Sequence, residues 1–354
     1  MSRALQLARR GLYTTDPNPR VGCVIVAGGE VVGEGWHERA GGPHAEVAAL
    51  AAAGERARGA TVYVTLEPCC HHGRTPPCVE SLIEAGAGRV VAAMQDPNPV
   101  VAGRGFERLR ASGIAVDCGV LAAEAAALNP GFVKRMMAGR PFVRVKIAAS
   151  LDGRTALASG ESQWITGADA RRDGHRLRAR SSAILTGIGT VFADDPRLSV
   201  RDVDFEITRQ PARVVLDSNL KLPSRARLFE GDAPVFVFTA ENHRRALQSP
   251  ARIERVALRD GGLDLNAVLE RLGELECNEV LVEAGAMLNG ALLDAGLVDE
   301  IVVYLAPVLL GDSGRGMFDL PGIGTMAARK PLRLVDERRV GADLRLTFVP
   351  QERD

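Results

Sequence analysis

The side chains best suited to chemistry lie in two short stretches, residues 44–46 and residues 67–78. His44 offers a neutral imidazole nitrogen, and Cys69 and Cys78 offer thiolates. Three such ligands form an open zinc site whose fourth position is left for a water molecule, and zinc lowers the pKa of that water to about 7. Glu46 lies two residues after His44, where a carboxylate can carry protons to and from the water and a leaving amine. The sequence therefore predicts a zinc site with an acid–base residue beside it.

Each half of this pattern is weak alone. His-Ala-Glu occurs by chance on many helices, and a Pro-Cys-Cys turn more often holds buried thiols. Together and in this order they favour a metal site of the kind found in zinc-dependent nucleobase deaminases, although here residues 70–77 separate the two cysteines. Cys70 is a rival ligand, but its side chain should point away from that of its neighbour Cys69. We expect the other cysteines to be structural thiols: Cys23, Cys118 and Cys277.

Composition narrows the class of protein. A chain of 354 residues with 46% hydrophobic residues has room for two or three domains. Its formal net charge of zero gives no general attraction to nucleic acid or to an anionic membrane. The N-terminal residues are too interrupted by charge for a signal peptide, and no apolar run reaches the ~18 residues of a membrane span. Six cysteines beside a metal motif suit a reducing compartment, so we expect a cytoplasmic protein.

Strand-like and helix-like segments alternate along both halves of the chain, which predicts α/β architecture throughout. Composition shifts near residue 140, where a new strand begins, so we expect one domain at 1–140 and a second, with a mixed sheet, at 141–354. The second half lacks a Rossmann fingerprint, because Phe192 stands where the third glycine after Gly187 and Gly189 is required. The glycine turns that follow strands near 187 and 285 still offer backbone N–H groups to a pyrophosphate.

The two stretches also support a family resemblance. Residues 44–46 (His-Ala-Glu) and 67–78 (Glu-Pro-Cys-Cys-His-His-Gly-Arg-Thr-Pro-Pro-Cys) resemble the deaminase half of the bifunctional riboflavin-biosynthesis deaminase/reductase family, in which the long cysteine spacing is usual. Residues 146–153, 162–166, 194–198 and 283–285 resemble its reductase half, so the resemblance covers nearly the whole chain. It implies an N-terminal cytidine-deaminase-like α/β/α domain followed by a dihydrofolate-reductase-like α/β domain.

The resemblance implies two successive reactions. A zinc-dependent hydrolytic deamination would act on a diaminopyrimidinone ribosylamine phosphate, and an NADPH-dependent reduction would then convert its ribosyl side chain to ribityl. The implied cofactors are Zn²⁺ and NADPH. The implied partner is this small-molecule substrate, with no nucleic acid and no membrane, and a homo-oligomer is allowed.

The resemblance also implies roles for individual residues, which are carried over from the family to the matching positions of this sequence. Those implied for NADPH are Ala148, Trp164, Thr190, Asp194, Ser218, Gly285, Ala286, Met287, Leu288, Asn289, Gly290 and Ala291. Those implied for the sugar phosphate are Ser162, Arg178, Leu198, Arg201 and Glu283. Asn18 matches a residue that contacts the pyrimidine in the family, although an Asn in a rigid turn also suits an Asx turn.

Five basic side chains suit a substrate phosphate. Arg178 and Arg201 offer planar bidentate donors, while solvated surface arginines are the alternative. His71 and Arg74, in the loop between the two cysteines, could also bind a phosphate or could simply be exposed. Lys146 points from a strand toward the same region as the two arginines, or else is an ordinary surface lysine.

Two other classes of protein fit parts of the pattern. The first is a nucleic-acid-editing zinc deaminase with a non-catalytic accessory domain, which zero net charge and an aromatic content of 4% disfavour. The second is a zinc-stabilised binding module without catalysis. Release of ammonia from a pyrimidine substrate distinguishes an enzyme from such a module.

Overall fold

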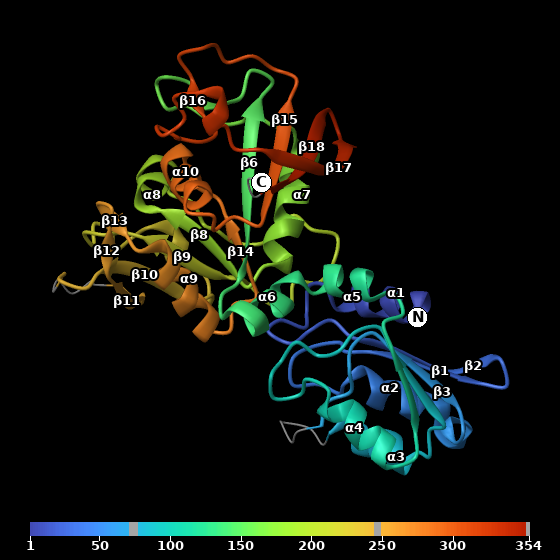
Figure 1. Ribbon diagram of the computed structural model, residues 1–354. Coiled ribbons are helices and arrows are strands. Elements are labelled where there is room, and N and C mark those ends of the chain that lie inside the picture. Colours follow the sequence, from blue (N-terminus) through green and yellow to red (C-terminus); the bar gives the residue numbers. More distant parts are fainter. Residues whose placement is uncertain (71–76, 244–248, 352–354) are drawn as a thin grey trace. The chain divides into compact units, whose positions relative to one another are not determined.

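The computed structural model describes residues 1–70, 77–243 and 249–351. Contacts within the chain divide it into two compact units, Met1–Arg140 and Pro141–Asp354. Each unit is built on its own sheet (Figure 1).

The first unit contains a five-stranded sheet in the order β2-β1-β3-β4-β5. Strand β1 pairs antiparallel with β2 and β3, while β3, β4 and β5 run parallel. Hydrophobic runs such as Gly-Cys-Val-Ile-Val-Ala in β1 suit a strand covered on both faces. The strands are β1 (Gly22–Ala27), β2 (Glu30–Trp36), β3 (Thr61–Val64), β4 (Arg89–Ala92) and β5 (Ala115–Cys118).

Helices cover both faces of this sheet. The main core joins β1, β3 and β4 to α2 (Ala45–Ala53), α3 (Cys78–Glu84) and α4 (Arg104–Ala111). On the opposite face, α1 (Ser2–Ala8) packs Leu7 against Val24, and Leu5 meets Ala93 and Ala125, the last from α5 (Ala122–Leu128). Helix α6 (Pro130–Ala138) ends the unit. The result is the three-layer α/β/α arrangement that the sequence predicted.

Two glycines of β2 let α2 lie unusually close to the sheet. A Cβ atom at Gly33 would lie 2.3 Å from the backbone oxygen of Ala49, and one at Gly35 would lie 2.4 Å from that of Ala45. Any side chain at these positions would force the helix away from the strand. Because His44 is the N-cap of α2, this close packing helps to set its position.

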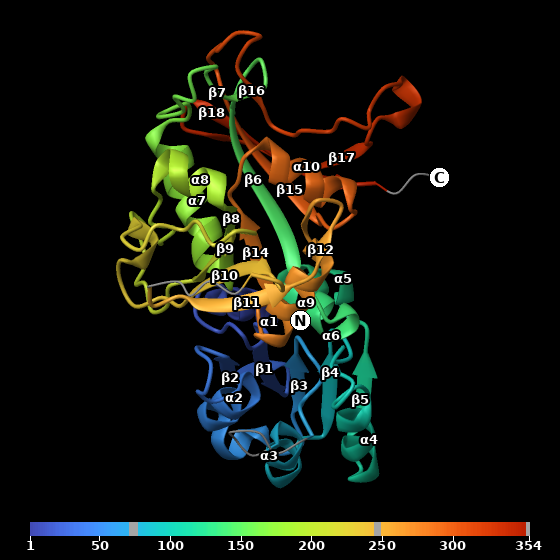
Figure 2. The ribbon, with the colours of Figure 1, turned by 90° about the vertical axis from the view of Figure 1, so that its left-hand side faces the viewer.

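The second unit contains a nine-stranded sheet in the order β11-β10-β9-β8-β14-β6-β15-β18-β17 (Figure 2). The strands from β11 to β15 run parallel, β18 pairs antiparallel with β15, and β17 pairs antiparallel with β18, so the sheet is mixed as predicted. The strands are β6 (Phe142–Ser150), β8 (Ala183–Gly187), β9 (Ala212–Leu216), β10 (Val235–Ala240), β11 (Arg252–Val256), β14 (Glu279–Val282), β15 (Glu300–Ala306), β17 (Leu332–Val340) and β18 (Asp343–Pro350).

Helices also cover both faces of the second sheet. The largest core packs α9 (Leu265–Glu274) and α10 (Ala286–Asp294) against one face, which includes Val143, Val145 and Ile147 of β6. The other face carries α7 (Ala168–Arg180) and α8 (Ile188–Asp194). Alternation along β6 therefore directs Arg144 and Lys146 to the face of α7. Small ladders join β7 (Arg154–Ala156) to β16 (Arg315–Gly316) and β12 (Leu258–Arg259) to β13 (Gly262–Leu263).

Within the described ranges, none of the helices combines the length and the apolar character that crossing a membrane requires.

Candidate functional site

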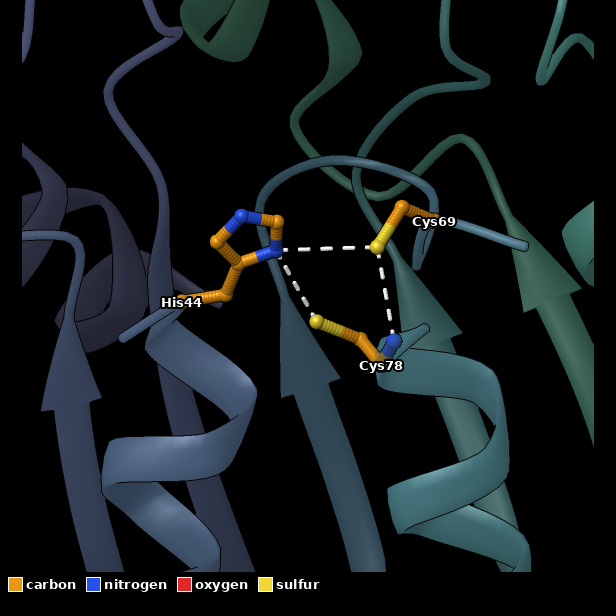
Figure 3. A group of neighbouring side chains, drawn as sticks. All are labelled: His44, Cys69 and Cys78. Atoms are coloured by element: carbon orange, nitrogen blue, oxygen red, sulfur yellow. Dashed lines mark hydrogen bonds between the residues drawn. The ribbon is translucent and has the colours of Figure 1, made fainter. Parts of the chain in front are cut away.

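His44, Cys69 and Cys78 come together in the first unit (Figure 3). His44 precedes α2, Cys78 opens α3, and Cys69 follows β3. Their ligand atoms all lie within 4.8 Å of one another. His44 Nδ1 is 3.1 Å from Cys78 Sγ and 3.6 Å from Cys69 Sγ. The side chains point toward a common centre from three separate elements.

The three residues fit a zinc ion. Zn–N bonds of about 2.0 Å and Zn–S bonds of about 2.3 Å in a tetrahedron separate nitrogen from sulfur by roughly 3.5 Å, close to the separations found here. The pKa of the Cys69 thiol is lowered, because Cys78 and His44 both donate hydrogen bonds to its sulfur. The pKa of the Cys78 thiol is raised by the same contact with Cys69 and by burial. Negative charge is therefore already favoured at the centre of the group, where a metal ion would deprotonate both thiols.

Glu46 lies beside this group in the first turn of α2 and is 3% exposed. Burial, followed by the charge on Cys69, raises the pKa of its carboxyl to about 7. A carboxyl group with this pKa can both accept and return a proton at neutral pH. Its position and its pKa suit the proton-carrying role that the sequence predicted.

Asn18 belongs to a hydrogen-bonded chain that the sequence did not reveal. Its Nδ2 lies 3.0 Å from Nε2 of His37, and Nδ1 of His37 lies 2.9 Å from the backbone oxygen of Pro43. Burial lowers the pKa of His37, which keeps the ring neutral, and a carbonyl oxygen can only accept. His37 Nδ1 must therefore donate and Nε2 must accept from Asn18. The Asn18 side-chain oxygen is left as an acceptor for another group.

The other cysteines lie outside the metal group. All six cysteines are free thiols, and Cys23, Cys70, Cys118 and Cys277 contribute no ligand atom to it. Burial raises the pKa of Cys70, unlike that of its neighbour Cys69. The predicted phosphate ligands His71 and Arg74 lie outside the described residues.

In the second unit, the residues predicted to bind NADPH, apart from Trp164, lie at or after the ends of four adjacent parallel strands, β9, β8, β14 and β6. Ser218 follows β9, Thr190 and Asp194 lie on α8 after β8, residues 285–291 follow β14, and Ala148 lies near the end of β6. The carboxyl ends of parallel strands meet at one edge of a sheet, which is where α/β folds bind ligands. A Cβ atom at Gly187 would lie 3.7 Å from Leu288, so the first turns of α8 and α10 are neighbours.

Residues 285–291 form the first turns of α10 and do not all face the same way. Gly285 is the N-cap, and a Cβ atom there would meet nothing within 4 Å. Asn289 is 1% exposed and donates to the backbone oxygens of Ala284 and Met317. A Cβ atom at Gly290 would lie 1.9 Å from the backbone oxygen of Asp319. Asn289 and Gly290 thus hold α10 against residues 317–319, and the exposed positions are Gly285, Ala291 and Met287, the last of which is 77% exposed.

The predicted phosphate-binding residues gather around α7. Arg178 forms a bidentate ion pair with Glu283, with N–O distances of 2.6 and 2.9 Å, and also donates to the backbone oxygen of Ser199. Burial alone would raise the pKa of Glu283, but Arg178 and then Lys146 lower it to about 2. Burial lowers the pKa of Lys146, whose Cε lies 3.7 Å from a Cβ built on Gly174. Arg178, Lys146 and Glu283 therefore form one cluster of charges, in which each side chain influences the pKa of at least one of the others.

His175 also belongs to this group, although the sequence gave no reason to single it out. It is 7% exposed, and its Nδ1 lies 3.4 Å from the backbone nitrogen of Arg201. Burial, then Arg178 and Arg201, lowers its pKa to about 4, so the ring is neutral at pH 7. Its position one helical turn before Arg178 on α7 is the only sequence signal that could have revealed it.

The remaining predicted residues lie in loops next to α7. Ser162 and Trp164 precede the helix, and Trp164 is 66% exposed with the guanidinium of Arg171 4.7 Å from its ring centroid. Leu198 is 2% exposed and has a φ of 49° in the loop after α8. Arg201 keeps a side chain that is 46% exposed and lies 3.8 Å from Asp202.

Comparison with known proteins agrees with both units. Residues 1–94 match the model of the cytidine and deoxycytidylate deaminase zinc-binding region, and residues 141–346 match that of the RibD C-terminal domain. The riboflavin biosynthesis protein RibD of Escherichia coli K12 is 52% identical over 99% of this chain and 98% of its own length. The Haemophilus influenzae protein of the same name is 50% identical over 99% and 96%.

Solved structures of related proteins also superimpose on 99% of this chain. Acinetobacter baumannii RibD superimposes with a TM-score of 0.93 at 46% identity, covering 99% of this chain and 98% of that one. A Thermotoga maritima protein described as a diaminohydroxyphosphoribosylaminopyrimidine deaminase/5-amino-6-(5-phosphoribosylamino)uracil reductase gives 0.88 at 37% identity, covering 99% and 97%.

The fold and the site define a bifunctional enzyme, a deaminase with a zinc site at His44, Cys69 and Cys78 joined to a reductase that uses a nicotinamide cofactor. The chain belongs to the RibD family of riboflavin-biosynthesis proteins. The resemblance, the fold class and the enzyme class expected from the sequence are confirmed. The alternative with a non-catalytic accessory domain is not supported, because the second half matches the family's reductase domain.

Proposed function

We propose that residues 1–140 deaminate a diaminopyrimidinone ribosylamine phosphate by hydrolysis and that residues 141–354 then reduce its ribosyl side chain to ribityl with NADPH. The observation that carries this proposal is the convergence of His44, Cys69 and Cys78 beside the buried carboxyl of Glu46. The Thermotoga maritima relative, named for both reactions, supports the choice of substrates.

In the deamination, His44, Cys69 and Cys78 hold zinc, which when bound lowers the pKa of a water molecule at its open position. Glu46 takes up a proton and delivers it to the departing amine, because a pKa of about 7 allows both transfers. Asn18 accepts a hydrogen bond from the pyrimidine through its side-chain oxygen. His37 fixes the amide in the orientation that makes this oxygen available.

In the reduction, the cofactor carries the hydride and the protein supplies binding and orientation. We assign NADPH to the edge of the sheet formed by the ends of β9, β8, β14 and β6, with Ala148, Trp164, Thr190, Asp194, Ser218 and the exposed first turn of α10. Arg201 and Lys146 bind the sugar phosphate, with Ser162, Arg178, Leu198 and Glu283 around it. Arg178 acts mainly by positioning, because Glu283 and Ser199 already occupy its donors.

The remaining assignments follow from the same chemistry. His71 and Arg74 are proposed phosphate ligands of the deaminating unit. Free thiols beside a zinc site support a cytoplasmic location. We propose no nucleic-acid or membrane partner, since the formal net charge is zero. Light scattering of the full chain measures whether it forms the homo-oligomer that the resemblance allows.

Product analysis tests the proposed function. The full chain is incubated with the diaminopyrimidinone substrate, with and without NADPH, and the products are identified by mass. Without NADPH, we expect ammonia and a product in which oxygen replaces one amine. With NADPH, that product should gain two hydrogens. Absence of ammonia from a zinc-loaded protein would contradict the proposal.

A further inference from the structure

Glu67 is a buried carboxylate with an unusual set of partners. It is 3% exposed and stands two residues before Cys69. Its Oε2 accepts hydrogen bonds from the backbone nitrogens of Asp96 at 3.1 Å and Gly103 at 2.9 Å. Its Oε1 accepts from those of Gly105 at 2.9 Å and Phe106 at 3.3 Å. Each carboxylate oxygen of Glu67 thus accepts two hydrogen bonds from main-chain N–H groups of one segment, residues 96–106.

The partners of Glu67 show what it holds together. Gly105 and Phe106 belong to the first turn of α4, whose free N–H groups attract a negative charge. Asp96 and Gly103 lie in the loop between β4 and α4. Among the residues that the structure describes, no lysine or arginine forms an ion pair with Glu67, so main-chain donors alone offset its charge.

A second contact joins the same two segments. A Cβ atom at Gly105 would lie only 2.2 Å from the backbone oxygen of Pro68 and 3.0 Å from Oε1 of Glu67. Helix α4 therefore lies directly against residues 67–68, immediately before the ligand Cys69. The backbone of Cys69 is fixed on its other side, where its carbonyl accepts from the backbone nitrogen of Val79 at 3.2 Å. The cysteine is thus held between α4 and α3.

We propose that Glu67 is a positioning residue for the zinc site, which sets the place of Cys69 by fastening residues 67–69 to the start of α4. It touches neither the metal nor the substrate and acts through Cys69. Groups that orient metal ligands commonly change metal affinity by about 10–100-fold when they are altered. This inference rests on the zinc site of the proposed deamination.

The test compares three variants of the full chain. Glu67→Gln keeps the shape of the side chain but replaces one carboxylate oxygen with an NH₂ group. That group cannot accept the hydrogen bonds that two main-chain N–H groups donate at this position. Gly105→Ala leaves the carboxylate intact and separates α4 from Pro68 by steric contact. Glu80→Gln is the matched control, because Glu80 lies on α3, two residues after Cys78, in an ion pair with Arg108 and with a side chain that is 40% exposed.

Zinc affinity is measured by competition with a chromophoric chelator, and the cobalt-substituted proteins are compared by their visible spectra. We expect Glu67→Gln and Gly105→Ala to weaken zinc binding by about 10–100-fold and to shift the cobalt bands, while Glu80→Gln matches the wild type. A purely structural role would lower the stability and leave the affinity and spectrum of the folded protein unchanged. Wild-type affinity and spectrum in folded Glu67→Gln would overturn the inference, and if that variant does not fold, Gly105→Ala decides in the same way. A wild-type chain that bound no zinc would contradict both the site and the inference.

Discussion

Arg178 and Glu283 form a bidentate ion pair across 105 residues of sequence, with N–O distances of 2.6 and 2.9 Å. Both side chains are 15% exposed, and Arg178 makes a third bond to the backbone oxygen of Ser199. The sequence predicted that the guanidinium of Arg178 binds a phosphate, but most of its donors already bond to Glu283 and Ser199. Arg201, with a side chain that is 46% exposed, is better placed to bind an incoming anion.

We predict that Arg201→Ala impairs the reduction and leaves the deamination intact. A hydrogen bond to a charged group contributes about 1.5–3 kcal/mol, so kcat/KM for reduction should fall by about 10–100-fold, mainly through KM. Arg172→Ala is the control, because Arg172 lies on α7 in an exposed ion pair with Asp169. Equal kinetics for the two variants would exclude Arg201 from phosphate binding.

We predict a preference for NADPH over NADH. Ser218, Asn219 and Lys221 follow β9 and offer donors to a 2′-phosphate, whereas Asp217 could have bound a free ribose hydroxyl instead. Asp217 is 1% exposed, and its side chain accepts a hydrogen bond from the backbone nitrogen of Leu222 at 2.7 Å. It therefore stabilises the turn after β9 and is not exposed to a ribose hydroxyl.

The measurement is kcat/KM for both cofactors in the wild type and in Lys221→Ala. In the wild type, kcat/KM should be at least about tenfold higher with NADPH than with NADH, since a charged contact contributes about 1.5–3 kcal/mol. In Lys221→Ala, kcat/KM should fall with NADPH and stay unchanged with NADH. Equal kcat/KM values for NADPH and NADH would contradict the prediction.

We predict that stability falls on acidification partly through His175. Its pKa is about 4 in the folded chain, below the ordinary value of 6.5. Between these pH values the unfolded chain binds a proton that the folded chain does not, so the free energy of unfolding decreases as the pH falls. The loss should reach roughly 1–3 kcal/mol.

Denaturant unfolding from pH 7 to pH 4 measures this loss. His175→Gln cannot take up the proton, so its stability should vary less over that range. The contribution of Glu283, whose pKa is lowered to about 2 from 4.5, belongs to a lower window and should persist in the variant. Identical slopes for wild type and variant would assign the pH dependence to other groups.

We predict about one zinc ion per chain and its loss in Cys69→Ser, because a hydroxyl is a far poorer zinc ligand than a thiolate. Metal content after dialysis against a chelator is the measurement. Cys118→Ser serves as the control, since Cys118 is an exposed free thiol outside the metal group. Full zinc occupancy and full deamination in Cys69→Ser would show that the ligand assignment is wrong.

The zinc group was predictable because its chemistry is local. Ligand types, their order and the flanking prolines are visible in the sequence, and α2 and α3 need only begin where His44 and Cys78 stand. Alternation of apolar and basic residues from Val143 to Ile147 likewise indicated that Lys146 lies on the face opposite the apolar side chains, which the structure covers with α7. These features depend on the period of a strand or on the start of a helix.

The rest depends on contacts between distant segments. Nothing near Arg178 in the sequence indicates that Glu283 occupies its donors, and nothing near Asn18 indicates that His37 fixes its amide. The burial of Asn289 and Gly290 against residues 317–319 likewise results from helix packing. A sequence pattern cannot distinguish a residue that binds a ligand from one that positions such a residue.

We propose that two separate sites perform the two reactions, and Glu46→Gln tests this separation most directly. Glutamine keeps the size of Glu46 and removes the proton carrier, so deamination should fall by about 10²–10⁴-fold or more. Zinc should remain, because Glu46 is not among the three ligands.

The variant is assayed separately on the diaminopyrimidinone substrate and on the already deaminated ribosylaminouracil phosphate with NADPH. We expect loss of ammonia release together with near wild-type reduction. If folded, zinc-loaded Glu46→Gln lost both activities, a single shared site would have to replace the two described here.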